Sequence, residues 1–214
     1  EVEFFVVDNV SGDALRREWT GYHEFAHLLI PYRGWGDAWF SEGLASYYQN
    51  LLQARSGIFS EQEMWQRLHD GFMRGRNDSR FDGVPLDEVS AGLRQNGGFM
   101  RVYWSGAWYF LAADLALRSQ SDGLFSLDTA LEKLNACCAD RSMSVPSMVH
   151  TLDELNRVSI FSNLYREAVL SESLPDFEPL VTALGIWIVD GQVRLDQNTA
   201  AARLRRGIIV APPL

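Results

Sequence analysis

The stretch GYHEFAHLLIPYRGWGDAWFSEGLASYY, residues 21–48, carries the strongest signal in the chain. Two histidines, His23 and His27, lie four residues apart, Glu24 follows the first of them, and Glu42 comes after a further loop and helix start. On an α-helix, positions i and i+4 lie on one face about a turn apart, so both imidazoles can reach one ion. The stretch therefore predicts either a metal site or a helix that carries histidines into the core.

The pattern around this stretch predicts two helices. Apolar and small side chains recur at helical spacing over residues 14–30, after Asp13 as a cap and before Pro31, which ends the pattern. A second helix is expected over residues 38–55, with Asp37 as its cap. The loop between the two helices would bring the second back against the first, and this would place Glu42 near both histidines.

The rest of the chain predicts a mainly α fold. Helical patterns continue over about 60–74, 86–94, 100–117, 126–138 and 146–171. Short strands are expected at VEFFVV (residues 2–7), in an Asp-Gly hairpin at GIWIVDGQVRLD (185–196) and at RRGIIVAPP (205–213). We expect a catalytic core over residues 1–140, and a C-terminal helical extension with the hairpin, residues 141–214, packed on it.

The composition excludes several classes of protein. With 214 residues, of which 47% are hydrophobic and 22% charged, the chain can bury a sizeable core and is not disordered. Its formal net charge of -9 has the wrong sign for neutralising phosphates, so we expect no nucleic-acid partner. An acidic balance suits a cationic ligand such as a peptide's amino terminus, although many folded proteins are acidic without such a ligand. No apolar run is long enough for a membrane span, and the oligomeric state is left open.

The cysteines and the start of the chain say little about the compartment. Cys137 and Cys138 are neighbours, and a bridge between neighbours is strained, so we expect no disulfide framework. The chain opens at Glu1 inside an apolar run. We therefore expect a piece of a longer protein, which would be exported or periplasmic if a signal lies upstream.

Zinc chemistry gives the residues of the first stretch distinct roles. A catalytic zinc site has three protein ligands, drawn from imidazole nitrogens and carboxylates, and a position left for water. We therefore expect His23, His27 and Glu42 to bind Zn²⁺. Glu24 adjoins a ligand without being one, so we expect it to act as general base on the attacking water. Ser46, one helical turn past Glu42, and Asp37, in the preceding loop, are candidates for orienting a ligand, and Asp37 is equally well explained as a helix cap alone. A lone histidine on an apolar helix is more often a core residue, but a core role leaves the spacing and both glutamates unexplained.

The chain resembles the gluzincins, the zincin metallopeptidases whose third zinc ligand is a glutamate. HEFAH at residues 23–27, followed by WFSEGLASYY at residues 39–48, is similar to the paired motif of zinc aminopeptidases. The gap between the motifs is short for the alanyl and leukotriene-hydrolase types. The similarity is greater to the glycyl aminopeptidase family, in which WFSEG and YY recur almost as they stand here. The resemblance implies a thermolysin-like catalytic helical domain, a zinc cofactor and a peptide substrate.

A third segment, VYWSGAWYFLAADLALR at residues 102–118, resembles that family's YxKGA segment and the helix ending in DLxLR. In the family, the tyrosine hydroxyl faces the metal and stabilises the oxyanion, so the resemblance implies a catalytic role for Tyr103. Ser105 stands where the family usually has lysine. Tyr103 could instead be a core tyrosine in an aromatic-rich helix. In that case the next candidates are Tyr22, Tyr47 and Tyr109.

Together these features predict zinc-dependent hydrolysis of a peptide bond. The resemblance alone implies an aminopeptidase. A zinc endopeptidase would use the same metal site in an open cleft, and a peptide blocked at its amino terminus would distinguish the two. A catalytically inactive, zinc-bearing peptide-binding module is also possible, but such a module has no need of Glu24. A structural helical domain, in contrast, would bind no metal.

Overall fold

The structure is a computed structural model that describes residues 9–30 and 37–210. Within them the fold is mainly α with one small hairpin, so the predicted fold class is confirmed. The strand expected over residues 2–7 and the loop over 31–36 lie outside the described residues. The elements are α1 (Gly12–Arg17), α2 (Trp19–Ala26), η1 (His27–Leu29), α3 (Ala38–Arg55), α4 (Glu61–Asn77), η2 (Ser79–Phe81), α5 (Leu86–Ala91), α6 (Leu93–Asn96), α7 (Phe99–Gln120), α8 (Leu127–Cys138), α9 (Val145–Asn156), α10 (Ile160–Val169), α11 (Glu178–Ala183), β1 (Ile186–Val189), β2 (Gln192–Leu195) and α12 (Ala200–Ile209).

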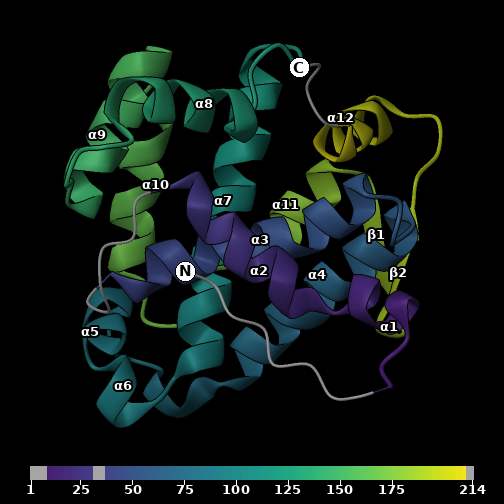
Figure 1. The fold of residues 1–214 in the computed structure, drawn as a ribbon, viewed down its shortest axis with the longest axis horizontal. Helices are drawn as coiled ribbons and strands as arrows, with labels where there is room; N and C mark the ends of the chain where they lie inside the picture. Colours follow the sequence, from purple (N-terminus) through teal and green to yellow (C-terminus); the bar gives the residue numbers. More distant parts are fainter. Residues whose placement is uncertain (1–8, 31–36, 211–214) are drawn as a thin grey trace.

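Helices α3 and α7 form the centre of the fold, and they cross backbone to backbone at two glycines (Figure 1). A Cβ atom on Gly43 of α3 would lie 2.3 Å from the Cα atom of Gly106 on α7. A Cβ atom on Gly106 would lie 1.9 Å from the backbone oxygen of Trp39. Neither position has room for any side chain. Because Glu42 precedes Gly43 and Tyr103 lies one turn before Gly106, the crossing fixes these two candidate site residues relative to each other.

The other elements surround this pair (Figure 1). Helix α2 packs along α3, and α4 packs against both α3 and α7. Helices α8, α9 and α10 form a group on one side, where α10 contacts α7. On the other side, β2 packs against α4, and α12 contacts α3 and α7. The elements after residue 140 thus lie against helices of the preceding segment.

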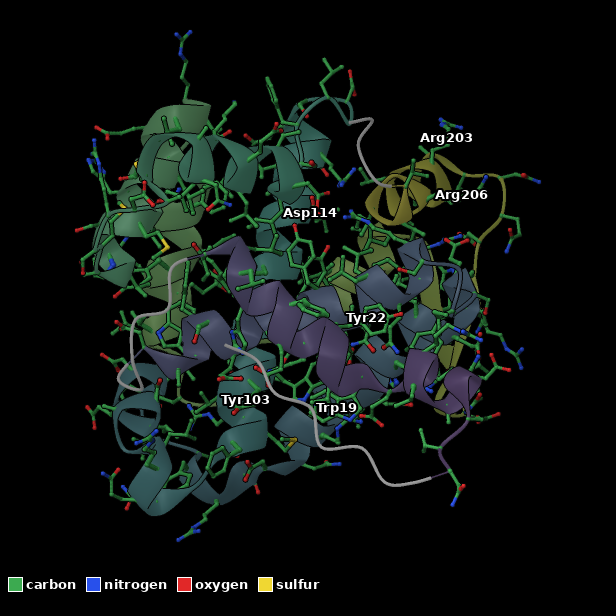
Figure 2. All side chains as sticks on the ribbon, in the orientation of Figure 1. Trp19, Tyr22, Tyr103, Asp114, Arg203 and Arg206 are labelled. Atoms are coloured by element: carbon green, nitrogen blue, oxygen red, sulfur yellow. A yellow bond between two sulfur atoms is a disulfide. The ribbon has the colours of Figure 1, made fainter. Side chains whose placement is uncertain are left out.

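A buried carboxylate on α7 connects three helices. Asp114, labelled in Figure 2, is only 1% exposed. The hydroxyl of Tyr47 donates a hydrogen bond to it at 2.8 Å, Arg118 Nε donates one at 2.8 Å, and the backbone N–H of Leu127 donates one at 2.9 Å. Burial, and then the charge of Asp114, raise the pKa of Tyr47 well above its usual value. The tyrosine therefore stays a neutral donor.

A second carboxylate, Asp128 on α8, extends this network. It accepts hydrogen bonds from the Tyr48 hydroxyl at 2.9 Å and from both terminal nitrogens of Arg55 at 2.9 and 2.8 Å. Burial opposes ionisation of Asp128, but the hydrogen bonds and charge of Arg55 outweigh it and lower the pKa of the carboxyl. Arg55 also donates to the backbone oxygen of Ile208 on α12. The tyrosine pair of WFSEGLASYY and the DLALR segment therefore brace the helices together.

The predicted hairpin is present. Strands β1 and β2 pair antiparallel, with Val189 opposite Gln192. Asp190 and Gly191 form the turn between them, with φ values of 50° and 74°. Positive φ at both central positions is the geometry that Asp-Gly favours in a two-residue hairpin.

The helix expected over residues 14–30 is interrupted, and its cap was predicted wrongly. Ser11, rather than Asp13, caps α1, because its side chain accepts a hydrogen bond from Ala14 N. Glu18 has an extended backbone, ends α1, and caps α2 through Thr20. Asp37 occupies the cap position of α3, but its side chain makes no capping hydrogen bond.

The strand expected over residues 205–213 is also wrong, since α12 covers its first part and residues 211–213 lie outside the described residues. Buried residues recur at helical spacing, at Ala202, Arg205 and Ile208. Arg205 is fully buried, pairs with Glu61 at 2.7 Å, and donates to backbone oxygens of the chain before α12. These tertiary contacts outweigh the strand preference of the β-branched residues.

Cys137 and Cys138, at the end of α8, are joined to each other by a disulfide. This bridge forms despite the strain expected between neighbours, and it ties no separate parts of the chain together.

None of the described helices combines the length and the apolar character that crossing a membrane requires.

Candidate metal centre

The two histidines and Glu42 converge where α2 and η1 lie on α3. Atom Nε2 of His23 is 3.0 Å from Oε2 of Glu42, and Nε2 of His27 is 3.6 Å from the same oxygen. One ligand atom from each of the three residues lies within 4.8 Å of the others. In residues 9–30 and 37–210 this is the one group of three or more His, Cys, Asp or Glu side chains that could hold an ion. The structure thus brings together the three ligands that the sequence predicts.

The spacing and chemistry of these atoms fit zinc. In a tetrahedral site with ligands about 2.0–2.2 Å from the ion, the ligand atoms lie about 3.3–3.6 Å from one another. The observed 3.0 and 3.6 Å are close to that spacing. Two imidazoles and one carboxylate are the ligand set of a hydrolytic zinc site. His23 and Glu42 are also only 5% and 8% exposed, so bulk water does not compete freely for these atoms.

A neighbour on α3 orients His23. The Nδ1 atom of His23 lies 2.8 Å from Oε1 of Gln49. With the proton on Nδ1 donated to this oxygen, the Nε2 lone pair faces the carboxylate of Glu42. In this tautomer no hydrogen lies between Nε2 and the carboxylate oxygen 3.0 Å away. A metal ion bound between His23, His27 and Glu42 would give all three side chains a partner.

Burial favours the neutral form of His27. The pKa of His27 is lowered, chiefly by burial, and the charge of His23 adds to this effect. The carboxylates of Glu42 and Glu24 act in the opposite direction but do not cancel it. The neutral imidazole is the form that binds a metal. Among the described residues, Nδ1 of His27 has no hydrogen-bond partner, in contrast to Nδ1 of His23.

Glu24 lies beside the ligands rather than among them. It follows His23 on α2 and is half-buried. Its charge is near enough to His27 to act on the pKa of that imidazole. This placement suits a group that acts on a reactant next to the ion, and the assignment of Glu24 as general base stays a prediction.

Tyr103 lies against the metal centre. Its ring is nearly parallel to the ring of His23, with an angle of 21° between the planes and 6.3 Å between the centroids. The remaining candidate tyrosines are placed differently. Tyr47 and Tyr109 are buried. The hydroxyl of Tyr47 donates to Asp114, and the hydroxyl of Tyr109 donates to the backbone oxygen of Phe161. Tyr22 lies on the opposite side of α2 from Tyr103 (Figure 2). Tyr103 is therefore the best placed of the four tyrosines for the predicted role.

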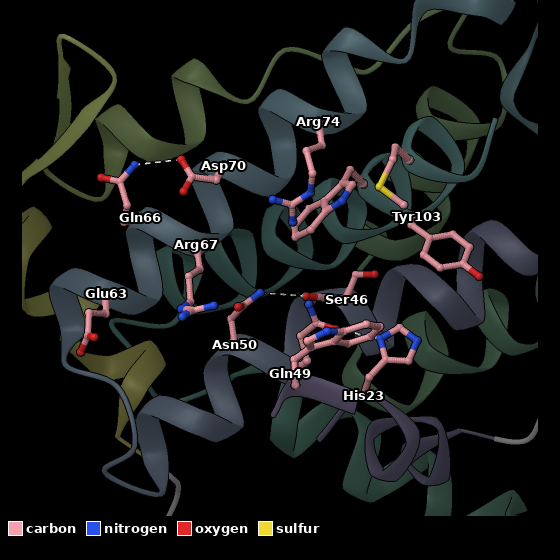
Figure 3. A pocket seen from close by; sticks show the side chains of 13 residues that line it. His23, Ser46, Gln49, Asn50, Glu63, Gln66, Arg67, Asp70, Arg74 and Tyr103 are labelled. Atoms are coloured by element: carbon pink, nitrogen blue, oxygen red, sulfur yellow. Dashed lines mark hydrogen bonds between the residues drawn. The ribbon is translucent and has the colours of Figure 1, made fainter. Parts of the chain in front are cut away.

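A cavity of about 670 Å³ opens beside these residues, between α4 on one side and α2 and α3 on the other (Figure 3). His23 and Tyr103 line it near the metal centre, and Glu63 and Gln66 line it farther along α4. Trp19 also lines it, with its ring centroid 5.4 Å from that of His23. Its size is within the range that binds small organic ligands, so a short peptide segment fits. The complete lining is Trp19, His23, Ser46, Gln49, Asn50, Glu63, Gln66, Arg67, Asp70, Arg74, Met100, Tyr103 and Trp104.

Gln49 is the site residue that sequence reasoning missed. Ser46 and Asp37 were the expected candidates for orienting a ligand, and the contact to His23 comes from Gln49 instead. A signal does exist, because Gln49 lies seven residues after Glu42, two turns along the same face of α3. The expected partner one turn along, Ser46, lines the cavity.

Comparison with known proteins supports the assignment for one part of the chain. Residues 35–108 match the family model of the M61 glycyl aminopeptidases. This stretch contains Glu42, Gly43, Tyr103 and Gly106, whereas the HEFAH motif precedes it. A comparison with curated proteins finds no match. The resemblance predicted from the sequence is thus confirmed over residues 35–108, which match the glycyl aminopeptidases, a family of zinc metallopeptidases.

Proposed function

We propose that this chain is a zinc-dependent aminopeptidase, with His23, His27 and Glu42 as its zinc ligands. The observation that carries the proposal is the convergence of these three side chains beside a cavity that can hold a peptide segment. The family match supports a zinc-dependent peptidase, and it includes the position of Glu42. The finer assignment to aminopeptidases rests on the sequence resemblance.

Each residue around the site has a separate role in the proposed hydrolysis. A bound zinc ion would supply a Lewis acid for the peptide carbonyl and lower the pKa of the attacking water. Glu24 takes the proton from this water and passes it to the leaving amine. Tyr103 donates a hydrogen bond to the oxygen on which negative charge develops. Gln49 holds His23 with its Nε2 atom directed at Glu42.

A pair of peptides tests the proposal. The zinc-reconstituted chain is incubated with Ala-Ala-Gln amide and with the same peptide acetylated at its amino terminus, and products are identified by mass spectrometry. We expect release of the first residue from the free-amine peptide alone. Equal cleavage of both peptides would identify an endopeptidase. Bound zinc without cleavage of either peptide would identify an inactive peptide-binding module.

A further inference from the structure

One wall of the cavity, formed by α4, carries side chains that have no role in the proposed reaction. Arg67 and Arg74 lie seven residues apart, two turns along one face of α4, and both line the cavity that also contains His23. Figure 3 shows both side chains reaching from α4 toward α2 and α3. Substrate bound beside His23 would therefore lie within the same cavity as two guanidinium groups.

Each guanidinium lies against an aromatic ring. The Cζ atom of Arg67 is 4.2 Å from the ring centroid of Phe59, and that of Arg74 is 5.2 Å from the ring centroid of Trp104. Trp104 is itself fixed, because it is 3% exposed and fills the space where a Cβ atom on Gly71 would stand. Stacking on a ring holds a guanidinium in place while its edge keeps N–H donors available. The ring contacts thus limit the positions that the two guanidinium groups take before a ligand binds.

Neither guanidinium has a carboxylate partner within 4.0 Å among the residues that the structure describes. The two acidic residues of the cavity lining are engaged elsewhere. Asp70 accepts a hydrogen bond from Gln66 at 2.9 Å, and Glu63 pairs with Arg17 at 3.1 Å. In a chain with a formal net charge of -9, the cavity therefore has two cationic groups that form no ion pair with the acids of its lining.

We propose that Arg67 and Arg74 bind a carboxylate of the substrate, so that the site selects peptides that carry one. The reaction performed on such peptides rests on the proposed function, but the binding preference does not. An arginine fork pairs with a carboxylate through two parallel hydrogen bonds, which gives geometric selectivity as well as affinity. The carboxylate can come from the C-terminus of a short peptide or from a Glu or Asp side chain. Arg74 stacks on Trp104, the residue after Tyr103, and both Tyr103 and Trp104 line the same cavity.

Three matched peptides separate the two sources. Ala-Ala-Gln amide carries no carboxylate, Ala-Ala-Gln carries one at its C-terminus, and Ala-Ala-Glu amide carries one on a side chain. Binding is measured by calorimetry on the zinc-loaded Glu24→Gln chain, which lacks the proposed base, and hydrolysis is measured on the wild type. We expect at least one carboxylate peptide to bind about tenfold to a hundredfold more tightly than the uncharged one, as for a hydrogen-bonded ion pair.

In the same Glu24→Gln background, the double variant Arg67→Gln/Arg74→Gln should remove this preference, so that the three peptides bind alike. Arg203→Gln is the matched control, because it removes a positive charge from the surface of α12, away from the cavity (Figure 2). Equal binding of all three peptides by the Glu24→Gln chain with both arginines in place would overturn the inference, and so would a preference that survives in the double variant. Both arginines are exposed, so the fold is expected to persist in the double variant. A preference in binding without hydrolysis would refute the proposed function alone, and hydrolysis without a preference would refute this inference alone.

Discussion

Substitution of Gly43 by alanine should disturb the centre of the fold and the metal centre together. The added Cβ atom would lie 2.3 and 2.4 Å from the Cα and carbonyl carbon of Gly106, and 2.9 Å from the backbone nitrogen of Ala107. Carbon atoms in contact are normally about 3.5–4.0 Å apart, so the two helix backbones must separate by roughly 1 Å. The obstructing atoms are all backbone, so no side-chain rotation can relieve the clash. We expect a cost of about 1–3 kcal/mol or more in the free energy of unfolding.

For a chain of this length, that cost corresponds to a fall in Tm of about 2–12 °C. Thermal unfolding followed by circular dichroism in excess chelator measures the packing effect without the metal. Zinc affinity, measured separately, should fall by about tenfold or more, because Glu42 is the adjacent residue and moves with the backbone. Gly12→Ala is the matched control, since Gly12 also lies in a helix and the nearest atom to its added Cβ is 3.7 Å away. A Gly43→Ala protein with the Tm and zinc affinity of the wild type would refute this description of the helix crossing.

Three further substitutions test individual side chains of the site. Glu24→Gln should retain zinc and lose at least about a hundredfold in kcat, and turnover near that of the wild type would remove Glu24 from the mechanism. Tyr103→Phe should keep zinc content and Tm nearly unchanged while kcat falls by about a hundredfold to a thousandfold, and an effect confined to KM would contradict a role in the transition state. Gln49→Leu should weaken zinc binding by about tenfold to a hundredfold, and Gln49→Glu, which keeps an acceptor for His23, should restore it. Equal zinc affinity in the Leu and Glu variants would show that the contact to His23 is unimportant.

The convergence of His23, His27 and Glu42 could be predicted from the sequence because it depends on local geometry. The spacing of His23 and His27 places both imidazoles on one helix face wherever that helix lies in the fold. The position of Glu42 beside the two histidines required only that the second helix pack back against the first. Gln49 could not be assigned in the same way, since its contact depends on the register between α2 and α3, which helical periodicity does not specify. The two arginines of the cavity wall depend likewise on how α4 packs.

The errors of the sequence interpretation have a common physical cause. Residues 14–30 keep a helical apolar pattern, so nothing in the pattern indicates that Glu18 is extended and caps a new helix. The IIV run before the C-terminus favours a strand by local preference, yet the contacts of buried Arg205 hold it in a helix. Next to Glu18, the side chain of Gln53 on α3 donates a hydrogen bond to the backbone oxygen of Arg17 at 3.0 Å. In both places, contacts with distant parts of the chain therefore accompany the local structure that the pattern did not predict. The hairpin was predictable because its Asp-Gly turn is a local signal.

Metal binding by the two histidines is the basis of the proposed function. The chain is purified without chelator, reconstituted with zinc, freed of unbound metal, and analysed for metal by mass spectrometry. We expect about one zinc ion per chain, and loss of that ion in His27→Ala. His150→Ala should keep it, because His150 is exposed, pairs with Glu154 at 3.4 Å and lies outside the group of ligands. A wild-type chain that stays metal-free after reconstitution would contradict the proposed zinc site, as would a His27→Ala chain that keeps its zinc.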